Sequence, residues 1–522
     1  MKITDETERN AFKQMEYKKL KHSDLHKIKT LGQLKAAGYQ PKSIKEELRE
    51  NLILKIKAKE NVFEGIWGYE DTVIPDIERA ILSRHNINLL GLRGQAKTRI
   101  ARMMTHLLDE YVPVVFGAEL NDDPMQPLTS YAKELIEEKG DDTPISWWHR
   151  SERYTEKLAT PDVSVADLIG DVDPIKAATM KLSYNDERVI HYGLVPRSHR
   201  SIFVINELPD LQARIQVALF NILQEGDIQI RGFKLRLPLD IQFVFTANPE
   251  DYTNRGSIVT PLKDRIESQI ITHYPKTLEI GKKITVQEAN LTGKPVDQIH
   301  IPELMKDLIE QIAIEARSSE YVDEKSGVSA RLTISAFENL VSAAERRLYM
   351  NGESNTVVRI ADLIGVIPAI TGKVELVYEG EQEGAGLVAY NLIGKAIRTQ
   401  FVNYFPSPEQ KKKEKQGNPY VLPLAWFGEG NVLDILASQS DKTYKEALHA
   451  VPGLEEVVTQ LAKNVPEKEK EFFMEFALHG LAEYSQLSKN LLDTGLQFKD
   501  LFSSMFDMGP GDEDDFEDED DL

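Results

Sequence analysis

The chain has 522 residues, a hydrophobic fraction of 41% and a formal net charge of −21. This length predicts about three or four domains, and the acidic balance argues against non-specific nucleic-acid binding by the whole surface. The sequence contains no cysteine, which excludes disulfides and thiolate zinc sites. Because no apolar run approaches the roughly 18 residues that cross a bilayer, and no secretory segment follows Met1, we expect a soluble, cytoplasmic protein.

The two ends of the sequence carry opposite charge. Residues 1–60 are rich in lysine and helical in pattern, which predicts an N-terminal helical arm. Within residues 506–522, the run Asp512–Asp521 is acidic at every position except Phe516. Such a run cannot bury itself, so we expect a disordered acidic tail that either solubilises the protein or docks a partner.

Strand-like apolar runs alternate with helical patterns over residues 61–272. The predicted strands are 87–90, 111–116, 202–205 and 241–247, and the predicted helices are 73–83, 99–108 and 211–223. This alternation predicts a parallel sheet with helices on its faces. The polar stretch 117–160 predicts an insertion at the sheet edge, and Trp147 and Trp148 either plug it onto the domain or stack on a ligand.

The second half of the chain is helical in pattern. Residues 273–374 predict one helical domain, and residues 387–505 predict a further helical unit with a basic loop at Lys411–Lys415. The acidic stretch 375–386, which contains Gly384 and Gly386, predicts a linker between them.

The stretch around which the chain is organised follows the first predicted strand and reads G-L-R-G-Q-A-K-T, residues 91–98. Glycines let backbone N–H groups turn toward an anion, and a lysine followed by a hydroxyl can hold the β/γ-phosphates and Mg²⁺. Ala96 stands where the pattern G-x-x-x-x-G-K-[ST] has its last glycine. Because alanine disfavours left-handed backbone, we expect the loop to enter the helix without a positive φ there. A polar turn with a chance lysine is the alternative.

Polar residues end two further predicted strands. Asn206 and Glu207 follow the run 202–205, and Asn248 follows the run 241–247. Ligands bind at the carboxyl ends of parallel strands, and nucleotide hydrolysis needs a phosphate cradle, a metal, a base that orients water and a polar group near the γ-phosphate. The combination with Lys97 and Thr98 predicts a nucleotide site, although Asn248 could instead close a turn.

These motifs resemble those of AAA+ ATPases, in particular the MoxR-like proteins and the I subunit of magnesium chelatase, over Phe63–Gly372. In that branch the phosphate loop is G-x-P-G-x-A-K-T, so Ala96 is expected and Arg93 replaces the proline. Residues 202–207 resemble Walker B, and residues 246–250 (T-A-N-P-E) resemble the sensor-1 ending. Residues 162–195 resemble the helix-2 insert, and residues 226–240 resemble the hairpin before sensor 1.

The resemblance implies a role for each motif residue. The catalytic residues would be Glu207, Asn248, Arg265 and Arg331. Arg265, from L-K-D-R, would be presented to the neighbouring subunit, and Arg255 is a weaker candidate for that role. Arg331 would act as sensor 2. ATP would be bound by Ile66, Gly68, Gly91, Gly94, Gln95, Ala96, Lys97, Thr98 and Arg99, and Mg²⁺ by Thr98 and Asn206. Arg265 and Arg331 could instead be ordinary surface residues, because a lone arginine on a helix usually is one.

One residue departs from the family pattern. Family members have an aspartate before the catalytic glutamate, whereas this chain has Asn206. A neutral amide holds the water shell of Mg²⁺ more weakly than a carboxylate does, so we expect ATP hydrolysis that is slow or needs raised Mg²⁺.

The expected fold is therefore an AAA+ α/β parallel-sheet P-loop domain with a helical lid (273–374), an N-terminal helical arm and a C-terminal helical domain. The resemblance implies an ATP-dependent motor or chaperone, a homo-oligomeric ring that is a hexamer in the family, and a partner with a von Willebrand factor A domain. Two alternatives stay open at this point: a nucleotide-gated assembly protein with little hydrolysis, and the ATPase subunit of a metal chelatase.

Overall fold

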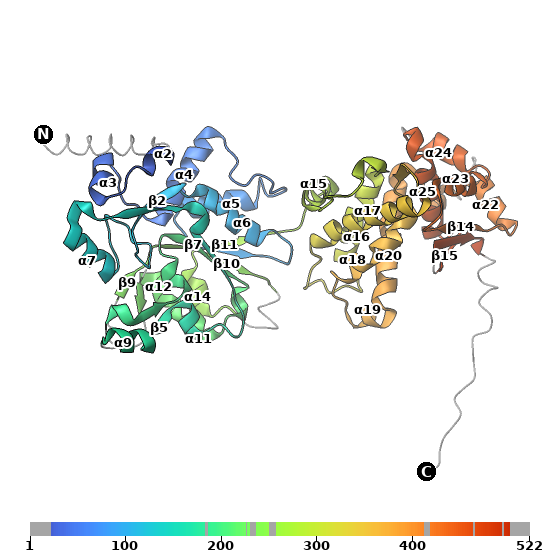
Figure 1. The fold of residues 1–522 in the computed structure, drawn as a ribbon. Helices are drawn as coiled ribbons and strands as arrows, with labels where there is room; N and C mark the ends of the chain where they lie inside the picture. Colours follow the sequence, from blue (N-terminus) through green and yellow to red (C-terminus); the bar gives the residue numbers. More distant parts are fainter. Residues whose placement is uncertain are drawn as a thin grey trace, which may run out of the picture. The chain divides into compact units, whose positions relative to one another are not determined.

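The computed structural model describes residues 22–182, 186–225, 227–229, 236–249, 257–411, 418–462, 465–492 and 495–501. The chain forms two compact units that divide between Tyr274 and Pro275 (Figure 1). The acidic tail, Arg255, Glu250 and most of the basic loop at 411–415 lie outside the described residues. Among the described helices, none combines the length and the apolar character needed to cross a membrane.

A five-stranded parallel sheet forms the centre of the first unit. Its order is β11-β1-β10-β7-β4, and each neighbouring pair is parallel. The strands are β1 (Ile87–Leu90), β4 (Tyr154–Leu158), β7 (Ser201–Asn206), β10 (Ile241–Ala247) and β11 (Ser268–Ile271). Every residue of β7 and β10 is buried, as expected for parallel strands covered on both faces. The carboxyl ends of β1, β10 and β7 therefore meet at one edge.

Helices cover both faces of this sheet (Figure 1). Ile202 and Val204 of β7 join one core cluster with α4 (Ile44–Ala58), α5 (Val73–Leu82) and α6 (Lys97–Met103). Phe203 and Ile205 point the other way and join a cluster with α11 (Ala213–Ala218), α12 (Phe220–Glu225) and α14 (Thr260–Arg265). This alternation follows from the two-residue period of a strand.

One predicted strand takes a different place. The run 111–116 was expected in the parallel sheet, but β2 (Tyr111–Val115) pairs antiparallel with β3 (Ile145–His149) in a separate two-stranded sheet. The edge position beside β7 is occupied by β4, which the sequence placed inside the insertion 117–160. A short apolar run predicts a strand but not its partner, because pairing is set by long-range packing.

The described part of the arm packs onto the first unit. It contains α2 (His22–Leu25), α3 (Leu31–Ala37) and α4. Glu47 of α4 accepts both ends of the buried Arg153 guanidinium, at 2.7 Å each. The Trp147 indole donates to the Ile28 carbonyl (3.0 Å), so this tryptophan plugs the β2–β3 segment onto the arm.

Two small antiparallel pairs fill the segments that resemble family inserts. Residues 162–195 contain α8 (Val165–Leu168), β5 (Gly170–Val172), α9 (Pro174–Met180) and β6 (Ile190–Tyr192), with β5 paired to β6. Residues 226–240 contain β8 (Asp227–Gln229) paired with β9 (Arg236–Pro238). The residues between β8 and β9 lie outside the described chain.

The second unit has one continuous core that runs from Ile299 to Phe498. Its main elements are α15 (Leu278–Glu288), α16 (Glu303–Arg317), α17 (Arg331–Asn351), α20 (Ala385–Tyr404), α25 (Lys470–Glu483) and the antiparallel sheet β14 (Leu433–Leu436), β16 (Gly495–Lys499) and β15 (Ser488–Leu492). The predicted linker 375–386 instead holds α19 (Tyr378–Glu383), and the Val377 N–H donates to the Tyr321 carbonyl (3.1 Å). Val374 and Val388, on either side, are buried in the same core, so the described residues before and after this segment in the second unit share one core.

Candidate functional site

The loop between β1 and α6 is fixed by close backbone packing. The Gly91 N–H donates to the Ala247 carbonyl at the end of β10 (3.1 Å). A Cβ on Gly91 would lie 1.9 Å from the Thr272 hydroxyl oxygen and 2.2 Å from Gln95 Oε1, so only glycine fits. Gly94 has a φ of 73°, a left-handed conformation that glycine adopts without strain.

Ala96 contradicts the sequence expectation. Its φ of 57° and ψ of 15° are left-handed, although the missing glycine predicted otherwise. A left-handed alanine costs roughly 1–2 kcal/mol. The conformation places the Ala96 carbonyl where it accepts the Ile100 N–H (2.9 Å) and begins α6, so the start of the helix offsets the local strain.

The Lys97 ammonium joins the loop to the end of β10. Its Nζ donates to the Gly91 carbonyl, to the Leu92 carbonyl (2.9 Å) and to Asn248 Oδ1 (2.7 Å). Asn248 is buried. The sequence predicts Lys97 and Asn248 in one site although they are 151 positions apart, and the structure brings them into direct contact.

A second set of contacts joins α6 to the end of β7. Thr98 Oγ1 donates to Asn206 Oδ1 (3.3 Å), and Thr246 Oγ1 donates to the same oxygen (3.0 Å). The Thr246 hydroxyl also accepts the Glu207 N–H (3.1 Å). Thr246 therefore fixes the relative positions of the β7 and β10 ends.

Glu207 has strained backbone. Its φ of 55° and ψ of 50° are left-handed, and non-glycine residues in this region cost about 1–3 kcal/mol each and cluster at functional sites. No hydrogen bond or ion pair joins its carboxylate to another described residue. The half-buried carboxylate thus stands at the sheet edge with capacity to accept a proton.

The segment before β1 also reaches the loop. The Tyr69 hydroxyl lies 2.7 Å from the His273 carbonyl and 3.2 Å from the Gln95 carbonyl, and burial raises the pKa of Tyr69 to about 12. Gln95 Oε1 accepts from the Thr272 hydroxyl (2.6 Å). Ile66 is buried in the adjacent core, and Gly68 has a φ of 81°. These contacts hold residues 66–69 against the loop.

The three predicted arginines that the structure describes lie in three different surroundings. Arg99 is exposed on α6. Arg265 donates to Gln224 Oε1 (2.7 and 3.0 Å) and to the Pro261 carbonyl, with its guanidinium over the Phe220 ring. Arg331 is exposed at the first residue of α17 in the second unit. The contacts of Arg265 hold it against α12 rather than against Lys97 or Glu207.

Sequence reasoning missed one charged residue at the site. Glu156 Oε1 on β4 accepts from Asn206 Nδ2 (2.6 Å). Tyr154 and Thr155 are strand-forming residues and are the signal that could have identified β4. Among the described residues, no group of three or more His, Asp or Glu side chains that could hold a metal ion is found.

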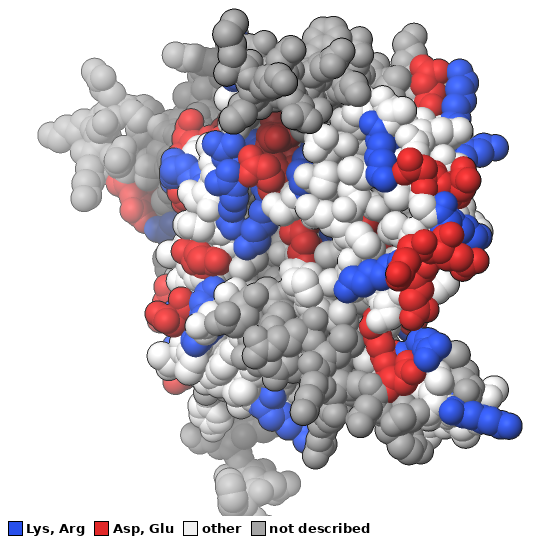
Figure 2. All heavy atoms as spheres, turned by 90° about the vertical axis from the view of Figure 1, so that its left-hand side faces the viewer, with Lys and Arg blue, Asp and Glu red and all other residues white. Residues whose placement is uncertain are grey.

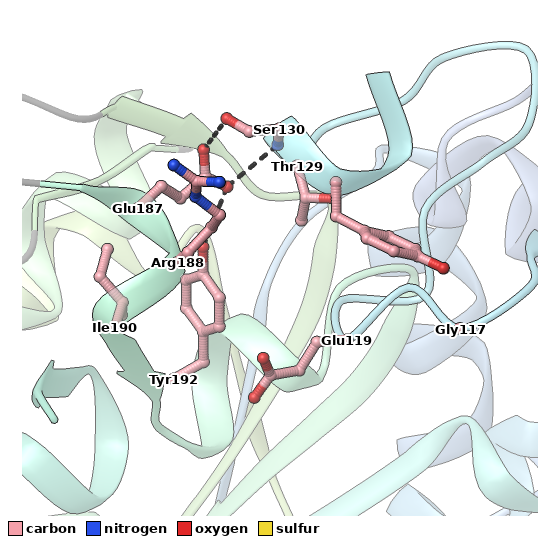
Figure 3. A pocket seen from close by; sticks show the side chains of 9 residues that line it. Gly117, Glu119, Thr129, Ser130, Glu187, Arg188, Ile190 and Tyr192 are labelled. Carbon is pink, nitrogen blue, oxygen red and sulfur yellow. Dashed lines mark hydrogen bonds between the residues drawn. The ribbon is translucent and has the colours of Figure 1, made fainter. Parts of the chain in front are cut away.

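A separate cavity of about 190 Å³ lies between α7 (Ser130–Lys139) and the 162–195 insert (Figure 3). Glu187 accepts from the Ser130 N–H (3.2 Å), the Ser130 hydroxyl and the Tyr192 hydroxyl (3.1 Å). These bonds join the cavity walls and satisfy the carboxylate, so they have a structural role.

Acidic and basic side chains are interspersed on the face of the first unit seen in Figure 2. The net charge of −21 is therefore not gathered into one acidic field on that face.

The strand order and the loop between β1 and α6 define an α/β domain with a parallel sheet and a phosphate-loop-like turn, beside which β7 and β10 end on polar residues. The structure confirms the predicted α/β fold class, with a central parallel sheet followed by a helical region. No family model matches the chain.

Solved structures similar to the chain include ATPases. A candidate ATPase from Cytophaga hutchinsonii is 17% identical, with 67% of this chain and 95% of that chain covered and a TM-score of 0.29. A complex of the magnesium chelatase subunits BchI and BchD is 18% identical, with coverages of 61% and 98% and a TM-score of 0.31. NtrX from Brucella abortus in complex with ADP is 14% identical, with coverages of 63% and 62% and a TM-score of 0.35. The fold assignment rests on the chain's own strand order and loop geometry.

Proposed function

We propose that the first unit binds ATP with Mg²⁺ at residues 91–98 and hydrolyses it, and that the chain is a MoxR-like AAA+ motor or chaperone that remodels a partner protein. One observation carries this proposal. Two consecutive residues of α6 reach the ends of two different strands: Lys97 Nζ lies 2.7 Å from Asn248 Oδ1, and Thr98 Oγ1 lies 3.3 Å from Asn206 Oδ1.

The chemistry follows from these groups. The Lys97 ammonium, now donating to backbone carbonyls, has the charge and reach to pair with phosphate oxygens. The Thr98 hydroxyl and Asn206 Oδ1 are hard oxygen donors, which fit Mg²⁺, and that ion would neutralise charge on the phosphates. Glu207 would take a proton from the attacking water, and Asn248 would hold the terminal phosphate beside Lys97.

A shared active site accounts for the position of Arg265. Its hydrogen bonds to Gln224 hold the Arg265 side chain against α12. From a neighbouring subunit it would stabilise charge on the γ-phosphate. Such head-to-tail contacts close into a ring, which we propose to be a cytoplasmic hexamer that acts on a partner with a von Willebrand factor A domain. Arg331 would contact the nucleotide as sensor 2.

Asn206 favours a second candidate, a nucleotide-gated assembly protein that hydrolyses little. The neutral amide weakens direct Mg²⁺ coordination relative to aspartate. The substitution N206D places two carboxylates at hydrogen-bond distance, since Glu156 Oε1 lies 2.6 Å from Asn206 Nδ2. We expect N206D to lower the Mg²⁺ concentration that turnover requires and to lower the melting temperature in EDTA. If N206D leaves turnover and its Mg²⁺ dependence unchanged, Asn206 does not limit hydrolysis.

Steady-state ATPase assays of the full chain test the proposed function. We expect K97A to abolish turnover and R265A to reduce it strongly, with R265A still binding ATP in a titration. Full activity in R265A would exclude the shared site, and full activity in K97A would exclude the phosphate loop. Tight ATP binding with negligible wild-type turnover, with and without a partner captured by E207Q, would favour the assembly protein.

A further inference from the structure

Glu156 is held in one orientation beside Asn206. Its Oε2 accepts from Arg102 Nη2 (2.9 Å) and from the Tyr154 hydroxyl (3.0 Å), while its Oε1 accepts from Asn206 Nδ2 (2.6 Å). Arg102 lies on α6, in the same helix as Thr98. Both carboxylate oxygens are therefore engaged, and Oε1 faces the site.

These contacts also fix the orientation of the Asn206 amide. An ionised carboxylate only accepts hydrogen bonds, so the NH₂ group of Asn206 must face Glu156. The amide oxygen then faces Thr98 and Thr246, whose hydroxyls donate to it. A charge-assisted bond to NH₂ polarises the amide and increases the negative charge on its oxygen.

An ordinary surface ion pair explains only part of this arrangement. The Arg102 side chain is 66% exposed and that of Glu156 is 27% exposed, and such pairs contribute about 0–1 kcal/mol. The bond to Asn206 is different because Asn206 is 8% exposed and directly contacts the threonine proposed to hold Mg²⁺. Arg102 and Tyr154 orient Glu156, and Glu156 acts on Asn206.

We propose that Glu156 supplies from strand β4 the negative charge that Asn206 lacks, so that the two residues together take the place of one aspartate in the magnesium site. Glu156 is a positioning residue that acts through the Asn206 amide. This inference rests on the proposed nucleotide site. It accounts for an asparagine at the end of β7 without requiring that the site be inactive.

The test is the effect of Mg²⁺ on ADP affinity, measured by calorimetry on the full chain in EDTA and in Mg²⁺. E156Q keeps an oxygen that can accept from Asn206 but removes the charge. We expect it to reduce the gain in affinity from Mg²⁺ by about tenfold, since partners of metal ligands typically contribute 10–100-fold to metal affinity. ADP affinity in EDTA and the melting temperature should stay at wild-type values. E152Q, on the exposed turn before β4, is the control for net charge and should match wild type.

The double variant E156Q/N206D returns one carboxylate and one amide to the pair, with their strands exchanged. We expect it to restore the Mg²⁺ effect to the wild-type level or above. If Mg²⁺ raises ADP affinity in E156Q as much as in wild type, the inference is overturned but the proposed nucleotide site is not. The same holds if E156Q loses ADP affinity equally in EDTA and in Mg²⁺. If E156Q does not fold, the inference is overturned when the double variant E156Q/N206D binds ADP with the same affinity in EDTA and in Mg²⁺. Wild-type protein that binds no ADP in either condition overturns the proposed function itself.

Discussion

The two units both bury charged side chains, but they use them differently. In the second unit, Glu475 accepts the Ile360 and Ala361 N–H groups (2.8 Å each) and the Tyr444 hydroxyl (2.8 Å), and Arg347 pairs with Asp362. These bonds join helices and backbone within one core. In the first unit, Lys97 and Thr98 at the start of α6 contact Asn248 and Asn206, which lie at the ends of two different strands.

The difference shows that burial of a charge does not by itself identify a site. The Arg347–Asp362 pair and the Glu475 bonds in the second unit connect groups within one core, and the buried Arg347 Nε has no hydrogen-bond partner among the described residues. At the sheet edge of the first unit, an ammonium is held by carbonyl oxygens, and Glu207 combines left-handed backbone with a carboxylate that has no described partner. Convergence of strand ends, strained backbone and exchangeable hydrogen bonds together indicate function.

The largest expected effect separates chemistry from binding in the first unit. E207Q removes the proposed proton acceptor and keeps the side-chain shape, so turnover should fall by about 10²–10⁴-fold. ADP affinity in Mg²⁺ should not change. Turnover is measured by phosphate release and affinity by calorimetry. Retained turnover would show that Glu207 is not the base.

In the second unit, removal of the buried charge of Arg347 should lower the free energy of unfolding. R347M leaves the buried Asp362 carboxylate without its partner, which typically costs about 3–5 kcal/mol. Urea unfolding followed by circular dichroism measures the loss, and the control R398M breaks the exposed pair with Glu409, which should cost about 0–1 kcal/mol. If R347M unfolded at the wild-type urea concentration, the structural role assigned to the Arg347–Asp362 pair would be wrong.

A smaller effect tests the strain in the phosphate loop. Because Ala96 is left-handed, A96G should stabilise the protein by about 1 kcal/mol, with the gain limited by the greater freedom of glycine in the unfolded chain. Thermal unfolding in EDTA measures it. A loss of stability would mean that the Ala96 methyl packs too well to be replaced.

The last expected effect is a pH dependence of stability in the first unit. Burial, with a contribution from Arg200, lowers the pKa of His199 to about 3, and its Nδ1 accepts the Asp240 N–H (3.0 Å). Below about pH 6.5 the unfolded chain binds a proton that the folded chain does not, so the free energy of unfolding falls with decreasing pH by at most about 1.4 kcal/mol per unit.

H199N keeps an acceptor but cannot titrate, so its stability should fall less steeply between about pH 6.5 and pH 4.5. Burial raises the pKa of Asp240 to about 6, and its ionisation has the opposite sign, but it is common to both proteins. Urea midpoints across this range provide the comparison. Parallel curves for wild type and H199N would contradict the assignment.

Local motifs predicted the residues at the centre of the proposed site, but they did not predict the strand pairing that brings Glu156 to it. Lys97, Thr98, Asn206 and Asn248 each follow a strand that its own apolar run identifies, and their meeting follows from a parallel sheet. Glu156 was missed because the partner of β4 is set by packing against β7, not by the sequence Tyr154–Leu158. The left-handed Ala96 is likewise imposed by its surroundings against its own preference.

The second unit shows the same limit. The acidic composition of 375–386 predicted a linker, but the apolar residues that flank it, Val374 and Val388, share one core. Composition describes the segment itself, whereas the fold depends on what its neighbours bury.

The most direct measurement is a structure of the E207Q variant with Mg²⁺ and ATP. We expect a γ-phosphate oxygen within hydrogen-bond distance of Lys97 Nζ and Asn248, with Mg²⁺ at the Thr98 hydroxyl and residue 207 facing the terminal phosphorus. A triphosphate bound elsewhere, or residue 207 turned away from it, would contradict the account.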